Sequence, residues 1–384
     1  MTSYNANIPM AKATYVVGPS PTHIVPIAPP MEPKKRKSGP LTETAIQRLM
    51  TQGFTRSLAE SLNITKEEFA LRIWIVDNSG SMQAADGHRM IKRGNVNLTT
   101  VDCTRWDEIC DCVEYHIRLS SLIEAPTRFR FLNSPGAMVG GSQISIAEGN
   151  EHPETEARNA ISMLRKVRPG GCTPLTQHIM EIHREVEAMA PELHRTGQRV
   201  AITIATDGLP TDERGYGGES YQNEFVESLR LLEGLPVWLV IRLCTDDDDV
   251  VDFYNNLDEI LELSIDVLDD FLGEAKEVFA ENPWLTYSLP LHRVREMGYH
   301  DRIFDMIDER KLTAGEMRDF CVLIFGSDLF DGAPHPAGDW KGFTKVLSNA
   351  LRSAETQWNP ISRKAKPFVS LKKLNRHYSR GSCF

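Results

Sequence analysis

The sequence has few of the features that mark secreted, membrane-spanning or nucleic-acid-binding proteins. Its seven cysteines are scattered and show no C-x-x-C spacing, which predicts reduced thiols in an intracellular protein. No apolar run approaches the length of about 18 residues that a membrane-spanning helix needs. The N-terminus lacks the charged start and apolar core of a signal peptide. The net charge of −10 argues against general nucleic-acid binding, which needs a basic surface.

The motifs of common enzyme sites are also missing. The chain contains neither of the glycine-rich phosphate-binding patterns, G-x-x-x-x-G-K-[ST] or G-x-G-x-x-G. His178 and His183 are five residues apart on a predicted helix, which does not fit H-E-x-x-H, and we expect both to face solvent. No nucleophile–base pair or second metal site can be recognised. We therefore predict no catalytic residues and no enzyme activity; a Mg²⁺-dependent hydrolase or transferase is the less favoured reading.

The most informative segment is Asp77-Asn-Ser-Gly-Ser81, which directly follows the β-prone run 71–76. An apolar strand that stops at an acid and two hydroxyls places three oxygen ligands at its carboxyl end. Open α/β sheets build their binding sites at this edge. Small oxygen donors suit hard divalent cations such as Mg²⁺, which keep water or a partner's oxygen in the remaining positions.

Two later segments supply further oxygen donors. Thr173 lies in the glycine-rich loop 170–175, and Asp207 follows a second apolar strand over 200–206. In this order, D-x-S-x-S, loop threonine and strand-Asp-Gly, the pieces resemble the von Willebrand factor A (VWA) domain with its metal-ion-dependent adhesion site. By that resemblance one Mg²⁺ (or Mn²⁺) would be held by five residues: Asp77, Ser79, Ser81, Thr173 and Asp207.

The resemblance also implies how such a site functions. In that family an Asp or Glu from a partner protein completes the metal shell, so we expect a protein–protein interaction through an acidic side chain. Thr206 and Asp212 would orient the surrounding loops rather than bind the ion. One alternative stays open at this point: the metal is purely structural, and the acidic or helical surfaces of the chain recognise the partner. The sequence leaves the oligomeric state undetermined.

Strand and helix patterns alternate between residues 69 and about 280. This order predicts an α/β fold with a doubly wound, mostly parallel central sheet, flanked by helices on both faces. The connections should be right-handed crossovers. The two strands that end in Asp77 and Asp207 would lie near the centre of the sheet.

The organisation predicted along the whole chain has five parts. They are a disordered, proline-rich tail (1–40), a helical lead-in (41–68), the VWA domain (69–281), a helical extension (282–355) and a basic C-terminal tail (356–384). In the first tail, the basic tract Lys34–Lys37 resembles a nuclear-import signal, with a solvated tract as the alternative. We therefore expect a cytoplasmic protein, with nuclear localisation as the second option.

Overall fold

A six-stranded sheet lies at the centre of the computed structural model, which describes residues 39–93, 97–136, 138–149, 151–245 and 247–378. The strand order is β5-β4-β1-β6-β7-β8. All neighbouring strands are parallel except β5, which runs antiparallel to β4. The predicted class, a mostly parallel sheet flanked by helices, is confirmed. The strands are β1 (Phe69–Val76), β4 (Thr127–Phe131), β5 (Gln143–Ile146), β6 (Arg199–Thr206), β7 (Val237–Leu243) and β8 (Ile265–Leu268).

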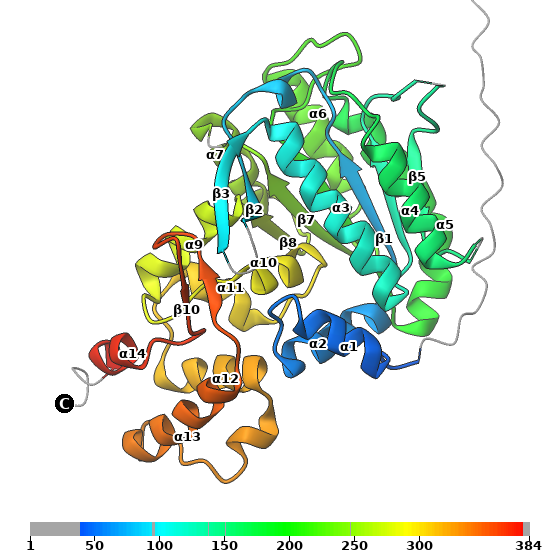
Figure 1. The fold of residues 1–384 in the computed structure, drawn as a ribbon. Coiled ribbons are helices and arrows are strands. Elements are labelled where there is room, and N and C mark those ends of the chain that lie inside the picture. The colour runs from blue at the N-terminus through cyan, green and yellow to red at the C-terminus, as the bar shows by residue number, and fades with distance from the viewer. Residues whose placement is uncertain (1–38, 94–96, 137, 150, 246, 379–384) are drawn as a thin grey trace, which may run out of the picture. The chain divides into compact units, whose positions relative to one another are not determined.

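Strand β1 is buried on both faces, as its mainly apolar sequence predicts, and its one charged residue, Arg72, is buried as well. Leu71, Ile73 and Ile75 face a core shared with α5 and α6, whereas Trp74 and Val76 face one shared with α3 and α4. Because side chains alternate along a strand, one apolar run supplies both cores. Helices therefore cover both faces of the sheet (Figure 1). Their bounds are α3 (Arg105–Ile123), α4 (Pro153–Leu164), α5 (Leu175–Thr196) and α6 (Glu219–Arg230).

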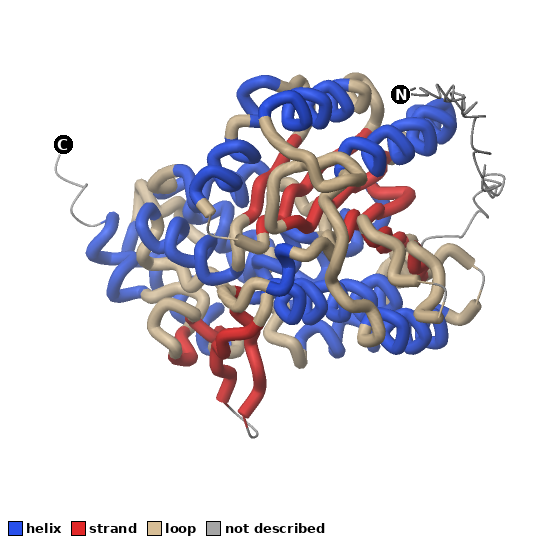
Figure 2. The backbone as a smooth tube through the Cα atoms, turned by 90° about the horizontal axis from the view of Figure 1, so that it is seen from above, coloured by secondary structure: helices blue, strands red, loops and turns tan. Residues whose placement is uncertain are grey.

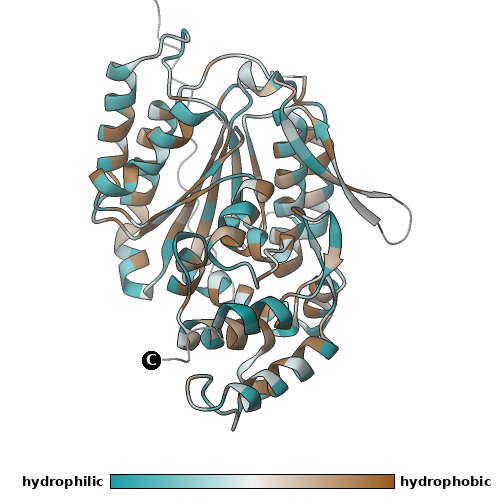
Figure 3. Cartoon of the chain, turned by 90° about the vertical axis from the view of Figure 1, so that its left-hand side faces the viewer, coloured by the Kyte–Doolittle hydropathy of each residue, from teal (hydrophilic) through white to brown (hydrophobic). Residues whose placement is uncertain are grey.

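The segment between β1 and α3 contains an element that the sequence analysis did not anticipate. Strands β2 (Gly87–Arg93) and β3 (Asn97–Cys103) pair antiparallel in a separate two-stranded ribbon. The ribbon stands out from the rest of the chain (Figures 2 and 3). It ends at Thr104, whose side chain accepts a hydrogen bond from Asp107 N and caps α3, as its sequence predicts.

Helices α1 and α2 share with the C-terminal helices a hydrophobic core that is separate from the two cores of the sheet and is called the second core below. Leu58 and Leu62 of α2 lie in the same buried cluster as Trp284, Phe304 and Phe320. The elements of this part are α1 (Glu43–Met50), α2 (Arg56–Glu68), α9 (Phe271–Glu281), α10 (Leu289–Glu296), α11 (Arg302–Glu309), α12 (Ala314–Phe325) and α13 (Trp340–Ser353). The short elements η1 (Ser81–Gln83), α7 (Asp248–Asn255), α8 (Leu257–Ile260) and η2 (Ser327–Phe330) complete the helices that precede α14.

The C-terminal region differs from its sequence-based description at its end. Within the helical extension expected over 282–355, the chain turns between α10 and α11, where Gly298 has a φ of +85° that favours glycine. The stretch expected to be a basic tail contains β9 (Gln357–Asn359), β10 (Lys364–Lys366) and α14 (Leu371–Tyr378). Phe368, Val369 and Leu374 anchor it in the second core, because their side chains are apolar although their neighbours are basic.

Several sequence-based expectations fall on residues that the structure does not describe or test. The N-terminal tail, with Lys34–Lys37, lies outside the described residues, as do residues 379–384. The predicted domain boundaries at 69, 281 and 355 stay predictions. Within the described ranges, no helix is both long and apolar enough to cross a membrane. The six cysteines in these ranges are free thiols.

A cluster of carboxylates surrounds the buried guanidinium group of Arg295. This group donates to Glu274 at 2.5 Å, to Asp308 at 2.8 Å and to Asp266 at 3.1 Å. Half-buried Asp305 lies beside them, and its pKa is raised to about 7 by burial and then by the charge of Asp266. Since the acids outnumber the cation, protonation of this cluster should stabilise the fold.

We expect Asp305→Asn to stabilise the protein in a pH-dependent way. The pKa of Asp305 lies above its ordinary value of 3.8, so ionisation destabilises the folded state as the pH rises from about 4 to about 7. The substitution should raise the free energy of unfolding by about 1 kcal/mol at pH 8, a value reduced for solvent screening, and by little at pH 4. Urea denaturation across this range measures it, with exposed Asp258→Asn as control. An equal effect of Asp305→Asn at both pH values would contradict the explanation.

Candidate metal centre

The two predicted acidic ligands lie side by side at the carboxyl edge of the sheet. Strands β1 and β6 are parallel neighbours with Val76 paired to Ala205, so the residues that follow them leave the sheet together. The amide of Asp77 donates to the carbonyl of Ala205 at 2.9 Å, and Asp207 follows Thr206 at the end of β6. Strand β4 continues the sheet on the other side of β1. The site thus occupies the place where the strand order reverses, which is where open α/β sheets bind ligands.

Hydrogen bonds connect four of the five predicted ligands. Asp77 Oδ1 accepts from the amide of Ser79 at 2.8 Å, and the hydroxyls of Ser79 and Ser81 are 2.9 Å apart. The hydroxyl of Ser81 then donates to Asp207 Oδ1 at 2.8 Å. Asp77, Ser79 and Asp207 are buried, whereas Ser81 is exposed. The oxygen atoms therefore form one group that is buried at Asp77, Ser79 and Asp207 and accessible to solvent at Ser81.

The fifth predicted ligand, Thr173, lies in a loop held against the serine loop. Gly80 N donates to Gly171 O at 3.1 Å, and Gly170 N donates to Asn78 O at 2.7 Å. Thr173 is itself buried, and its amide donates to Thr211 Oγ1 at 2.9 Å. Within the described part of the chain, the hydroxyl of Thr173 forms no hydrogen bond to the other four predicted ligands. The structure therefore places Thr173 beside the site through backbone contacts.

Asp77 carries the clearest electrostatic signature of the site. Burial, followed by the nearby charge of Asp207, raises the pKa of Asp77 to about 6. Hydrogen bonds from the hydroxyls of Thr206 (2.6 Å) and Ser79 partly oppose this shift. Two buried carboxylates that repel each other form a site in which a bound cation would be favourable. The negative charge that attracts the cation comes from these two carboxylates, because the serine and threonine hydroxyls are neutral.

Arg105 is a member of the site that the sequence analysis missed. Its Nη1 donates to Asp207 Oδ2 at 3.0 Å, and its Nε and Nη2 donate to Asp86 at 2.7 and 2.6 Å. These hydrogen bonds, the one to Asp86 first, raise the pKa of Arg105 and keep it charged. Arg105 opens α3, and neither its spacing nor its neighbours indicate Asp207. Only the packing of α3 on the sheet brings it there.

The two residues predicted to orient loops make hydrogen bonds of that kind. The hydroxyl of Thr206 contacts Asp77 Oδ2 and thus holds the orientation of this carboxylate. Asp212 Oδ1 accepts from the amides of Arg214 (2.9 Å) and Tyr216 (2.8 Å), which closes the turn that follows β6. Asp212 contacts the loop backbone, and no contact to the predicted ligands is found within the described part of the chain.

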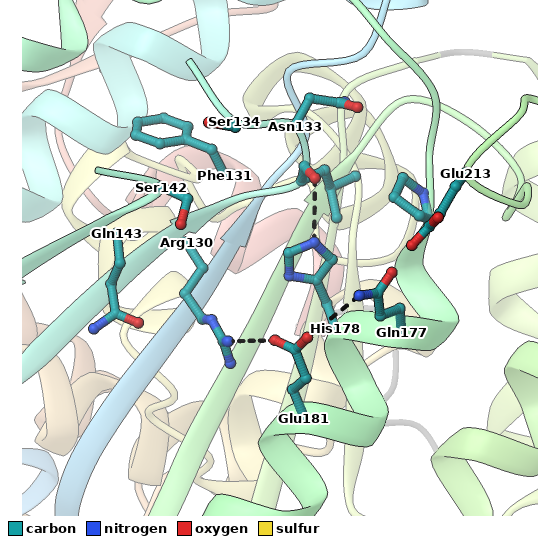
Figure 4. Close-up of a pocket in the computed structure, with 12 residues that line it drawn as sticks. Arg130, Phe131, Asn133, Ser134, Ser142, Gln143, Gln177, His178, Glu181 and Glu213 are labelled. Atoms are coloured by element: carbon teal, nitrogen blue, oxygen red, sulfur yellow. Dashed lines mark hydrogen bonds and ion pairs between the residues drawn. The ribbon is translucent and has the colours of Figure 1, made fainter. Parts of the chain in front are cut away.

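A polar cavity of about 380 Å³ lies next to this loop system (Figure 4). Asn133 and Pro174 are in its wall, together with Arg130, which pairs with Glu181 at 2.7 Å. His178 also lines it, with Nε2 3.2 Å from the Leu132 carbonyl oxygen. The expectation that His178 faces solvent was wrong: α5 packs this residue against the end of β4, and burial lowers its pKa.

Comparisons with known proteins give no family for this chain. No family model matches it, and no curated protein matches it. Among solved structures, the D319A mutant of the PilB minor pilin from Streptococcus sanguinis matches at 13% identity and a TM-score of 0.34. The pilus adhesin SpaC from Lactobacillus rhamnosus GG, in an open conformation, matches at 15% identity and a TM-score of 0.35. The matches cover 52% of this chain and 56% of the minor pilin, and 53% of this chain and 28% of the adhesin.

These findings correct the family assignment made from the sequence. The five-residue pattern led to the VWA family, its adhesion site and the magnesium that the family binds there. Neither a family model nor a curated relative supports that assignment. A few short motifs constrain a small fraction of the chain, so they can agree with a family while the rest does not. The chain is assigned here to no family, and its candidate site stands on its own geometry.

Proposed function

We propose that this protein binds a hard divalent cation, Mg²⁺ or Mn²⁺, and that the cation recruits a partner protein through an Asp or Glu side chain. The cation would lie among the oxygens of five residues: Asp77, Ser79, Ser81, Thr173 and Asp207. The observation that carries the proposal is the pair of buried, mutually repelling carboxylates, linked by two serine hydroxyls at the carboxyl edge of the sheet. Oxygen donors of this kind are what hard cations require.

The charges around the site favour an anionic partner group. Arg105 neutralises part of the charge of Asp207, so the two acids do not fully offset a bound dication. Ser81 is exposed, which leaves a side from which an external carboxylate can approach. A carboxylate that reaches both the cation and the guanidinium group would gain from two positive charges at short range.

Two further aspects belong to the same proposal. We interpret the sheet as doubly wound, because the strand order reverses beside β1 and helices cover both faces. We also place the interaction inside the cell, supported by the free thiols of the described cysteines. The absence of enzyme activity remains a prediction from the missing catalytic motifs.

A purely structural role of the cation is the second candidate, favoured by the near-complete burial of Asp77 and Asp207. A capture experiment distinguishes a cation that recruits a partner from a purely structural cation. Wild-type protein and Asp77→Ala serve as bait in native lysate, with Mg²⁺ or with EDTA. A protein captured only by wild type with Mg²⁺ is purified, and its candidate Asp and Glu residues are replaced by Asn and Gln.

We expect direct binding of the purified partner to require Mg²⁺, Asp77 and one partner carboxylate. Arg105→Gln should retain the cation and weaken the partner about 5-fold, because one of the two positive charges is lost. Asp258→Ala, an exposed acid outside the site, is the control. Partner binding that persists both in EDTA and in Asp77→Ala would support the structural role instead.

A further inference from the structure

A second group of metal-ligating side chains lies between α3 and α10, outside the candidate metal centre. Cys112 and His116 are one helical turn apart on α3, and His292 and Glu296 are one turn apart on α10. At a spacing of four residues each pair shares one helix face. All four side chains are buried, with exposed fractions of 1% or less. Neither the proposed cation site nor the fold description assigns them a role.

The other three side chains each lie close to the carboxylate of Glu296. Cys112 Sγ is 3.2 Å from Glu296 Oε1, and His116 Nε2 is 2.8 Å from Glu296 Oε2. The ligand atoms of these three residues lie within 4.8 Å of one another. A fourth, His292 Nε2, is 3.3 Å from Glu296 Oε1. Ligands about 2.0–2.3 Å from one tetrahedral zinc ion are themselves roughly 3–4 Å apart, and the separations measured from Glu296 lie near this range.

His292 is oriented as a metal-binding histidine would be. Its Nδ1 is 3.2 Å from the hydroxyl of Tyr287, which leaves Nε2 facing Glu296. That buried Nε2 forms no hydrogen bond within the described residues, although it lies close to a carboxylate. A histidine whose second nitrogen is held by a neighbouring group, with the first directed at a cluster of donors, is the usual arrangement around a metal ion.

The charges around the cluster determine whether a dication can bind. A thiolate at Cys112 and the carboxylate of Glu296 together offset two positive charges. Arg242 pairs with the buried Glu108, and its Nε also lies 3.7 Å from Glu296 Oε1. Arg293 Nη1 contacts Cys112 Sγ at 2.9 Å and Glu296 Oε2 at 2.7 Å. Its side chain is 13% exposed, and metal binding would require it to move away from these two atoms.

We propose that Cys112, His116, His292 and Glu296 form a closed, four-coordinate site for a transition-metal ion of the Zn²⁺ type. On binding, the Cys112 thiol releases its proton to solvent and forms the metal–sulfur bond, with no change of oxidation state. The mixed sulfur, nitrogen and oxygen donors select a softer ion than the all-oxygen site at the sheet edge. The ion joins α10 to α3 and so ties the C-terminal helices to the sheet.

Cobalt(II) tests this site in the full chain, because a tetrahedral Co²⁺–thiolate centre has a sulfur-to-metal charge-transfer band and strong visible bands. We expect chelator-treated wild type to develop both with one equivalent of Co²⁺, and one equivalent of Zn²⁺ to remove them. Cys112→Ser should lose the charge-transfer band and bind about 100-fold more weakly. Cys321→Ser, which replaces another buried thiol, should behave as wild type.

Two more variants keep the test decisive. His116→Gln leaves the thiol in place and should convert or abolish the tetrahedral spectrum, so the test does not depend on the folding of Cys112→Ser alone. Asp77→Asn, at the other site, should retain the full Co²⁺ spectrum in excess Mg²⁺. A wild-type protein without a charge-transfer band, or a band that is unchanged in both Cys112→Ser and His116→Gln, would overturn the proposal.

Discussion

Asp77→Asn is expected to make the cation-free protein more stable and, at the same time, to abolish its response to divalent cations. Asp77 is fully buried, and its pKa is raised to about 6 from 3.8 by burial and by Asp207. Its ionisation therefore destabilises the fold above about pH 6, and this penalty disappears as the pH falls toward 4. With each pKa unit equivalent to 1.36 kcal/mol, removing the charge should raise the free energy of unfolding by about 3 kcal/mol at pH 8.

With a saturating cation the order should reverse. Wild type should gain about 4 kcal/mol at a cation concentration 1,000 times the dissociation constant, whereas Asp77→Asn should gain nothing measurable. Urea denaturation with EDTA and with Mg²⁺, at pH 8 and pH 5, measures both effects. Asp212→Asn keeps the acceptor oxygen that closes its turn and should respond to Mg²⁺ as wild type does. A normal Mg²⁺ response of Asp77→Asn would remove this residue from the site.

Phe320→Ala should have the largest effect on the fold itself, a loss of about 3–5 kcal/mol in the free energy of unfolding. Phe320 is completely buried, and its ring centroid lies 5.5 Å from that of Phe304 and 6.4 Å from that of Trp284. Truncation removes a large apolar side chain and leaves a cavity in a core that α2 shares with the C-terminal helices.

Urea denaturation followed both by tryptophan fluorescence and by circular dichroism measures this loss. Phe279→Ala is the matched control, because Phe279 is 37% exposed and its main contact is Lys373 Nζ at 4.3 Å from the ring centroid; we expect less than about 1 kcal/mol. If Phe320→Ala left the stability unchanged, the second core would not be the cooperative unit that its burial indicates.

Local patterns were sufficient for much of the fold. The runs that became β1, β6 and β7 are mainly apolar and flanked by polar turns, so their type and approximate bounds could be predicted. Thr104 caps α3, and Thr313 with Glu316 forms a capping box at α12, so both helix starts depend on residues within one turn of each other. The ribbon of β2 and β3 was missed, because its residues alternate weakly and its strands pair with each other outside the main sheet.

Interactions between distant segments could not be predicted in the same way. Arg105 is 102 positions from Asp207, and their contact follows from how α3 crosses the sheet. Cys112 was interpreted as one of several scattered thiols, since its partner Glu296 is 184 positions away on another helix. The four-residue spacing of Cys112 and His116, and of His292 and Glu296, is visible in the sequence. The packing of α10 against α3 brings these two pairs together in one cluster.

The sequence by itself determined the class of the fold and the place of the first site. Periodicity sets the alternation of strands and helices, and a parallel sheet brings the carboxyl ends of its strands to one edge, where Asp77 and Asp207 meet. The tertiary structure decided what surrounds them. Burial raises the pKa of Asp77, α3 delivers Arg105, and the docking of α10 creates a second candidate site. These features depend on distances between segments that are far apart along the chain, and no local pattern records such distances.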